Sequence, residues 1–213
     1  MDSNLIIGFL LGIVASGIAA VIYERATSPL VEVSLDHRPI ALGQYPNLPP
    51  LAFYHLKIRN LPARLPLTSR KPAWSSKATI EVFNLDSTRA IAEPIHARWP
   101  SQPEPLIPAV AGNQSINLVD FARLMNARKV DIHAHEDEHI ALAVKYDGQP
   151  ECYLFSNESY LHHAWANPAW RLNSGEYRVL VTVFYERGRA KREFTLTNLR
   201  TARNSVEIDY ATT

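Results

Sequence analysis

The feature that most constrains this chain is an uncharged, apolar stretch close to its N-terminus. Leu5–Tyr23 reads LIIGFLLGIVASGIAAVIY, and Glu24 ends it. As an α-helix these residues rise about 28 Å, close to the roughly 30 Å thickness of the hydrocarbon core of a bilayer. Tyr23 falls at the depth where aromatic side chains favour the interface. The sequence therefore predicts a transmembrane anchor over residues 1–25 and a soluble domain over residues 26–213.

A cleaved signal peptide is the competing interpretation of the same stretch. Such peptides begin with a basic segment and have a shorter apolar core. Residues 1–4 (MDSN) contain no lysine or arginine, which favours a retained single-pass membrane anchor. Arg25 and Arg38 follow the stretch, so the positive-inside rule places the soluble domain in the cytoplasm. The lone cysteine, Cys152, agrees with a reducing compartment because it has no partner for an intrachain disulfide.

Small residues recur along one face of this predicted helix. Gly8, Gly12, Ser16 and Ala20 follow one another at steps of four. Such a row lets a second helix backbone approach closely, although glycine and alanine are also common in membrane helices that have no partner. The row indicates a helix-packing face toward partner subunits or a second copy of the chain.

The region after the anchor has the pattern of a mainly β domain. Leu51–Arg59 (LAFYHLKIR) alternates, with Leu56 on the side that faces a core and His55 on the side that faces water. Val119–Ala127 is the one short segment with a helical pattern. Fifteen prolines against eight glycines indicate many loops and sheet edges. Further predicted strands are Leu30–Leu35, Ala78–Leu85, Ile95–Trp99, Val130–Ile132, Ile140–Tyr146, Cys152–Phe155, Gly175–Tyr185, Glu193–Leu199 and Val206–Tyr210.

Short strands at fairly regular spacing, without long helices between them, favour a single antiparallel β-sandwich with immunoglobulin-like packing. Gly175-Glu176-Tyr177 supports this fold. A tyrosine at the entrance of a late strand is typical of the tyrosine corner, in which the phenol ties a loop to the sandwich.

Several sequence blocks together resemble a known group of proteins. They are residues 54–60 (YHLKIRN), Arg98-Trp99 with Pro103-Glu104-Pro105, residues 157–160 (NESY), and residues 165–172 (WANPAWRL) leading into Gly175-Glu176-Tyr177. The chain resembles uncharacterised prokaryotic membrane-anchored proteins with an immunoglobulin-like β-sandwich domain. The resemblance implies a fold and carries over no activity.

One segment matches a zinc-protease motif literally. His135-Glu136-Asp137-Glu138-His139 reads H-E-x-x-H, in which two histidines one helical turn apart bind zinc and the glutamate activates water. Here the flanking residues have a strand pattern, and both x positions are acidic, whereas that helix normally packs in a core. We therefore expect a solvated loop between two strands. A strand-borne site from His133, His135 and His139 is a second, weaker metal interpretation, and no pattern indicates a cofactor.

The remaining candidates are surface features. With a net charge of +1, the chain has no overall positive potential that would attract nucleic acid, so nucleic acid is not expected as a partner. Arg187 and Arg189 lie in a basic turn that would contact lipid phosphates or an acidic partner, or would only be solvated. Trp165, in a loop rich in aromatic residues, is the best candidate for an exposed interaction residue.

Together these features favour a non-catalytic accessory or scaffolding subunit of a membrane complex, which docks through its helix and its sandwich. A membrane-tethered sensor or ligand-binding module is the alternative, and it requires a pocket. A zinc-dependent hydrolase using His135, Glu136 and His139 is a remote alternative, and it requires that segment to be helical.

Overall fold

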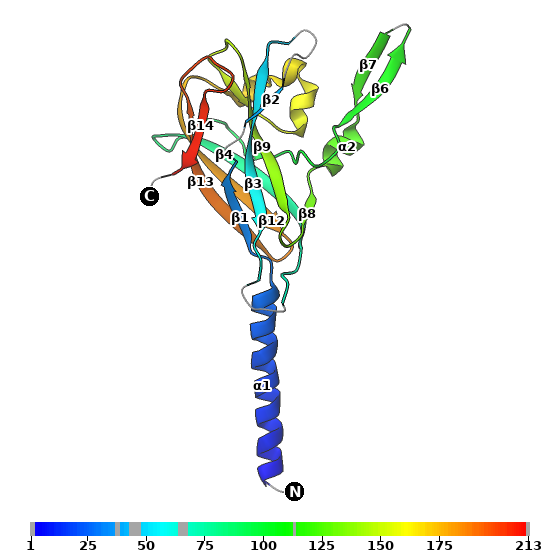
Figure 1. The fold of residues 1–213 in the computed structure, drawn as a ribbon, viewed down its shortest axis with the longest axis vertical. Helices are drawn as coiled ribbons and strands as arrows, with labels where there is room; N and C mark the ends of the chain where they lie inside the picture. The colour runs from blue at the N-terminus through cyan, green and yellow to red at the C-terminus, as the bar shows by residue number, and fades with distance from the viewer. Residues whose placement is uncertain (1–2, 37–38, 43–47, 64–67, 113, 212–213) are drawn as a thin grey trace.

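The computed structural model describes residues 3–36, 39–42, 48–63, 68–112 and 114–211. Its first element, α1 (Ser3–Thr27), extends away from a β domain that follows it along the chain (Figure 1). The side chains from Ile7 to Tyr23 are exposed. Residues Ile7–Thr27 are long and apolar enough to cross a membrane, a test that a signal sequence near an N-terminus also passes. The predicted apolar helix is therefore confirmed.

Two antiparallel sheets form the body of the β domain, and the described part of the chain is mainly β. The first sheet has the order β1–β3–β9–β10–β11, and β2 pairs with β3. Its strands are β1 (Val31–Leu35), β2 (Ile40–Leu42), β3 (Leu51–Asn60), β9 (Asp137–Tyr146), β10 (Cys152–Leu154) and β11 (Arg171–Leu172).

The second sheet has the order β14–β13–β12–β4–β5, and β8 pairs with β4. Its strands are β4 (Ala73–Asn84), β5 (Ile95–His96), β8 (Val130–Ile132), β12 (Gly175–Tyr185), β13 (Gly188–Asn198) and β14 (Val206–Tyr210). β12 and β13 form a long hairpin, in which Tyr185 pairs with Gly188 at the turn. The mainly β, antiparallel fold predicted from the alternating pattern is confirmed.

The main core lies between the two sheets. Leu56 and Ile140 from the first sheet belong to the same buried cluster as Ile80 and Val181 from the second. Trp99 follows β5 and is fully buried in this cluster. The apolar face of each sheet is thus covered by the other, which is what the period of two in these strands requires.

A second core cluster covers the outer face of β9, which the sequence pattern did not indicate. Leu51, Val144, Tyr146 and Phe155 are buried there. Three short 3₁₀ helices continue the chain after β10: η1 (Asn157–Leu161), η2 (His163–Trp165) and η3 (Pro168–Trp170). Tyr160 and Trp165 from these turns pack against the cluster. Both faces of β9 are therefore covered. The alternating pattern predicts burial of the side chains on one face only, so it misses those on the other.

The same region corrects the predicted orientation of His55. The pairing register of β3 and β9 shifts between Tyr54 and His55, which marks a β-bulge or similar irregularity. Both side chains are buried. A bulge changes the direction in which successive side chains point, so the strict alternation that placed His55 in water was wrong at this position.

A hairpin that the sequence analysis did not identify projects from the domain (Figure 1). It consists of β6 (Leu106–Ala111) and β7 (Gln114–Val119). The short helix α2 (Phe121–Asn126) follows, and the Asp120 side chain accepts hydrogen bonds from the backbone N–H groups of Ala122 and Arg123. The helix predicted over Val119–Ala127 is therefore present, and it begins after its cap.

Candidate functional site

Three segments that are far apart along the chain meet where α1 joins the β domain. The Glu24 carboxylate, in the last turn of α1, accepts a hydrogen bond from Lys71 Nζ at 2.6 Å. It also forms an ion pair with the Arg187 guanidinium, from the β12–β13 turn. The β12–β13 hairpin is long enough to reach the helix, so one carboxylate connects α1 to both the β4 side and the β12–β13 side of the second sheet.

Backbone contacts reinforce this junction. Lys71 N–H donates to the Thr27 carbonyl oxygen at 2.7 Å, and the Arg70 guanidinium donates to the Ser28 carbonyl oxygen at 2.7 Å. Leu30 N–H donates to Asn60 Oδ1 at 3.1 Å. The last carbonyls of a helix have no partner within the helix, and here the segment before β4 supplies donors to them. Only Ser28, Pro29 and Leu30 separate the end of α1 from the start of β1.

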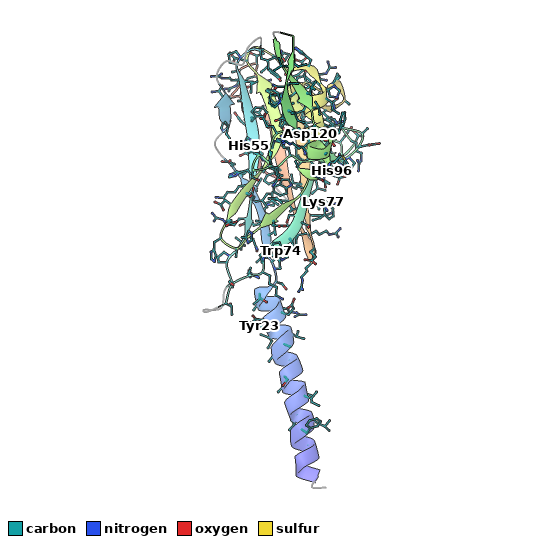
Figure 2. The ribbon with its side chains drawn as sticks, turned by 90° about the vertical axis from the view of Figure 1, so that its right-hand side faces the viewer. Tyr23, His55, Trp74, Lys77, His96 and Asp120 are labelled. Atoms are coloured by element: carbon teal, nitrogen blue, oxygen red, sulfur yellow. The ribbon has the colours of Figure 1, made fainter. Side chains whose placement is uncertain are left out.

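A small cavity of about 130 Å³ lies beside the junction. Lys71, Trp74 and Arg187 line it together with Pro72, Tyr185 and Glu186. Trp74 is 44% exposed, and its ring meets that of His133 edge to face, with 5.7 Å between the ring centres. Figure 2 shows Trp74 at the end of the domain that faces the helix, and Tyr23 on the helix just below that end. The cavity thus combines two cations with an exposed aromatic ring.

The two predicted basic residues have different positions at this junction. Arg187 is tied to Glu24, whereas Arg189 is exposed on the first residues of β13. Sequence reasoning missed Glu24 and Lys71 as members of this site. No local sequence pattern indicates that these residues meet, because Glu24 is 47 positions from Lys71 and 163 positions from Arg187 along the chain.

The four small residues of α1 lie along the helix as predicted. Apart from the adjoining residues and nearby backbone of the helix itself, a Cβ atom added at Gly8 or Gly12 would have no described atom within 4 Å. Ser16 Oγ donates to the Gly12 carbonyl oxygen at 2.8 Å. Ser16 and Ala20 are exposed. Outside the helix itself, no described residue is therefore seen to cover this face.

The H-E-x-x-H segment is a turn that leads into β9 (Asp137–Tyr146), and it is not helical. His135 and Glu136 lie between β8 and β9, and His139 lies on β9. His135 has a positive φ of 71°, which excludes a regular helix at that residue. His139 Nε2 is 3.3 Å from Asp36 Oδ2, and His133 contacts Trp74. Among the described residues, no group of three or more histidine, cysteine or acidic side chains could hold a metal ion.

Trp165 is only partly exposed, in contrast to the exposed loop residue that the sequence indicated. Its ring centre lies 5.8 Å from that of Phe53, 6.1 Å from that of Tyr160 and 6.2 Å from that of Phe155. Trp165 therefore packs against the second core cluster. Only the exposed part of its side chain could contact another protein.

A second cavity, of about 210 Å³, lies beside this aromatic cluster. Arg98 is 4% exposed there; it donates to Asn157 Oδ1 at 2.7 Å and to the Gln102 carbonyl oxygen at 3.0 Å. Its guanidinium carbon lies 5.3 Å from the Tyr160 ring centre. No ion pair with a carboxylate of the described residues neutralises it. Sequence reasoning missed this site because nothing in the pattern around Arg98 indicates a buried cation.

His55 lies at the same cavity. Its Nδ1 atom is buried and finds no hydrogen-bond partner among the described residues. Burial lowers the pKa of His55 to about 4, and the nearby His139 adds to this effect while Asp36 opposes it. The imidazole is therefore neutral at neutral pH.

Comparisons with known proteins add no relative. No protein-family model matches the chain, and neither the curated proteins nor the solved structures compared with it include a match. The resemblance to prokaryotic membrane-anchored sandwich proteins therefore stays a prediction.

Proposed function

We propose that this chain is a single-pass membrane protein in which α1 holds the β domain at the membrane surface. In this proposal it acts as a non-catalytic accessory or scaffolding subunit of a larger membrane complex. The observation that carries the proposal is the braced junction, in which Glu24 contacts both Lys71 and Arg187. A helix fixed to its domain in this way sets the orientation of that domain, which is what a scaffolding subunit requires.

The junction also supports retention of the helix. Thr27 is buried, and its carbonyl oxygen accepts a hydrogen bond from the domain. Cleavage of residues 1–25 as a signal peptide would remove Glu24 and leave Lys71 and Arg187 without this partner. Arg25 supports a cytoplasmic domain, while Arg38 lies outside the described residues. The buried thiol of Cys152 agrees with that side.

We infer that the two packed sheets form an immunoglobulin-like sandwich. The Tyr177 hydroxyl, near the start of β12, donates to the Asn173 carbonyl oxygen at 3.2 Å. This bond from a strand tyrosine to a backbone group a few residues upstream is the hallmark of a tyrosine corner. His135 lies in a turn and His139 lies on β9, so the two histidines are not on one helix face as a zincin requires. This arrangement supports a non-catalytic role.

The proposal is tested by placing a bulky side chain on the small-residue face of α1. Gly12→Leu should reduce recovery of the intact complex roughly tenfold, the effect of losing about 1.4 kcal/mol of helix packing. Gly17→Leu is the matched control, because Gly17 lies about 140° around the helix from Gly12. An added Cβ there also meets no described atom beyond the adjoining residues and nearby backbone of the helix itself. The readout is the size and composition of the particle extracted from the native membrane in mild detergent.

A large particle with stoichiometric membrane partners, lost in Gly12→Leu and kept in Gly17→Leu, is the expected result. Recovery of a lone protomer from the wild type would contradict the subunit role. It would favour the second candidate, a tethered sensor or ligand-binding module. The cavity lined by His55 and Arg98 is the observation that favours that candidate.

A further inference from the structure

Cations outnumber anions where α1 joins the β domain. We compare the described residues of the helix end, of residues 70–74 and of the turn 185–189. These residues include five cations, Arg25, Arg70, Lys71, Arg187 and Arg189, and two anions, Glu24 and Glu186. The surplus of positive charge is local, because the whole chain has a net charge of only +1.

Glu24 does not neutralise its two partners. One carboxylate is shared between Lys71 and Arg187, and both cationic side chains remain well exposed, at 39% and 52%. A second anion can therefore reach them without unfolding the junction. Arginine offers a planar pair of N–H donors that matches a phosphate group, and lysine offers a compact charge.

The adjoining cavity has the composition expected of a headgroup site. Lys71 and Arg187 line its polar part, and Trp74 and Tyr185 supply aromatic rings. Tryptophan side chains favour the interface between headgroups and acyl chains, where one edge of the ring is apolar and the other is wet. Trp74 is 44% exposed at this end of the domain (Figure 2).

The cavity also lies at the depth of lipid headgroups when α1 spans a bilayer. Ser28 is about 7.5 Å along the helix axis from Tyr23, at 1.5 Å per residue. The headgroup layer on each side of the hydrocarbon core is roughly 5–8 Å thick. Because Arg70 and Lys71 contact the helix end at Ser28, Thr27 and Glu24, they lie within this layer.

We propose that the cavity between Lys71, Trp74 and Arg187 binds the phosphate of an anionic phospholipid headgroup in the leaflet that the domain faces. Lys71 and Arg187 donate to the phosphate, and Trp74 packs beside the glycerol region. This inference rests on the membrane-anchor part of the proposed function and is independent of any partner subunit.

The test uses the full-length chain purified in mild detergent and supplied with equal amounts of phosphatidylglycerol and phosphatidylcholine. Native mass spectrometry then counts the lipids that stay bound to each protomer. Phosphatidylglycerol should be retained about fivefold or more over phosphatidylcholine, the effect expected when one basic residue attracts an anionic lipid.

Two single variants distinguish lipid binding from a structural role. Arg187→Gln should lower the preference for phosphatidylglycerol about fivefold, because it removes a phosphate donor. Glu24→Gln should raise the preference, because it removes the carboxylate that competes for Lys71 and Arg187. Both variants break the same ion pair, so damage to the junction alone would change lipid retention in the same direction. Arg171→Gln, an exposed cation on β11, is the control and should change nothing.

Equal retention of the two lipids by the wild type would overturn the proposal, as would a change in the same direction for Glu24→Gln and Arg187→Gln. The intact mass of the protein separates this outcome from failure of the proposed function. A protein that has lost residues 1–25 contradicts the anchor itself, whereas a retained anchor without lipid preference contradicts the headgroup site.

Discussion

Replacing Trp99 with alanine is expected to lower the free energy of unfolding of the β domain by about 4 kcal/mol. Trp99 is 0% exposed and lies in the main core cluster between the sheets. Its indole Nε1 donates to the Arg128 carbonyl oxygen at 3.3 Å. Alanine would remove the buried ring, leave a cavity that neighbouring strands only partly fill, and leave that carbonyl without its donor.

Trp74→Ala provides the matched control for this change. The same atoms are removed from a ring that is 44% exposed, so we expect a loss below about 1 kcal/mol. Urea unfolding of the full-length chain in mild detergent, followed by circular dichroism, measures both variants. Equal losses at the two positions would show that the interface between the sheets does not provide the main stability of the domain.

Acid is expected to destabilise the protein through His55 well before its carboxylates are protonated. The pKa of His55 is lowered from 6.5 to about 4, chiefly by burial. Between these two values the unfolded chain binds a proton that the folded protein does not, so stability falls as the pH falls. The loss between pH 7 and pH 4.5 should be about 2 kcal/mol.

His55→Phe should remove most of this pH dependence while keeping an apolar ring in the buried site. His96 contributes a smaller effect of the same sign, because burial also lowers its pKa. The Asp137 carboxyl, whose pKa is lowered by Arg59 and Lys57, loses its stabilising effect only below its ordinary value of 3.8. Parallel stability curves for the wild type and His55→Phe from pH 7 to pH 4.5 would rule out His55 as the cause.

Elements with strong periodicity could be predicted from the sequence. Val179, Val181 and Val183 alternate along β12 and are all buried in the core. The helix α1 could be predicted just as readily, because its apolar run is long enough to cross the hydrocarbon core of a bilayer. In both cases the residue pattern along the element is itself enough to indicate which side chains are apolar and where they lie.

Other features depend on contacts that local sequence does not specify. Lys145 is fully buried on β9, where its ammonium donates to the Pro150 carbonyl oxygen at 2.9 Å and to Asn198 Oδ1 at 2.8 Å. Alternation along Ile140–Tyr146 gave no sign that both faces of the strand are covered. The β6–β7 hairpin was missed because it packs no apolar face on the main core, and the junction was missed because its charges are distant in sequence.

The junction couples the orientation of α1 to that of the β domain. Lys71 and Arg187 hold Glu24, the Arg70 guanidinium donates to the Ser28 carbonyl oxygen, and the Lys71 N–H donates to the Thr27 carbonyl oxygen. A change in helix tilt would therefore turn the β domain with it. Partner helices that pack on Gly8 and Gly12 would then set the direction in which the domain points.

The claim that α1 and the β domain move as one body is tested most directly by a distance distribution between two spin labels. Cysteines introduced at Ile22 and Glu176 are both at exposed positions. The native thiol of Cys152 should not react, because it is buried and burial raises its pKa to about 12. A variant with a glycine–serine linker inserted between Ser28 and Pro29 gives the reference for a flexible joint. A single distribution much narrower than that of the linker variant is expected, and a distribution as broad as the variant's would contradict the braced junction.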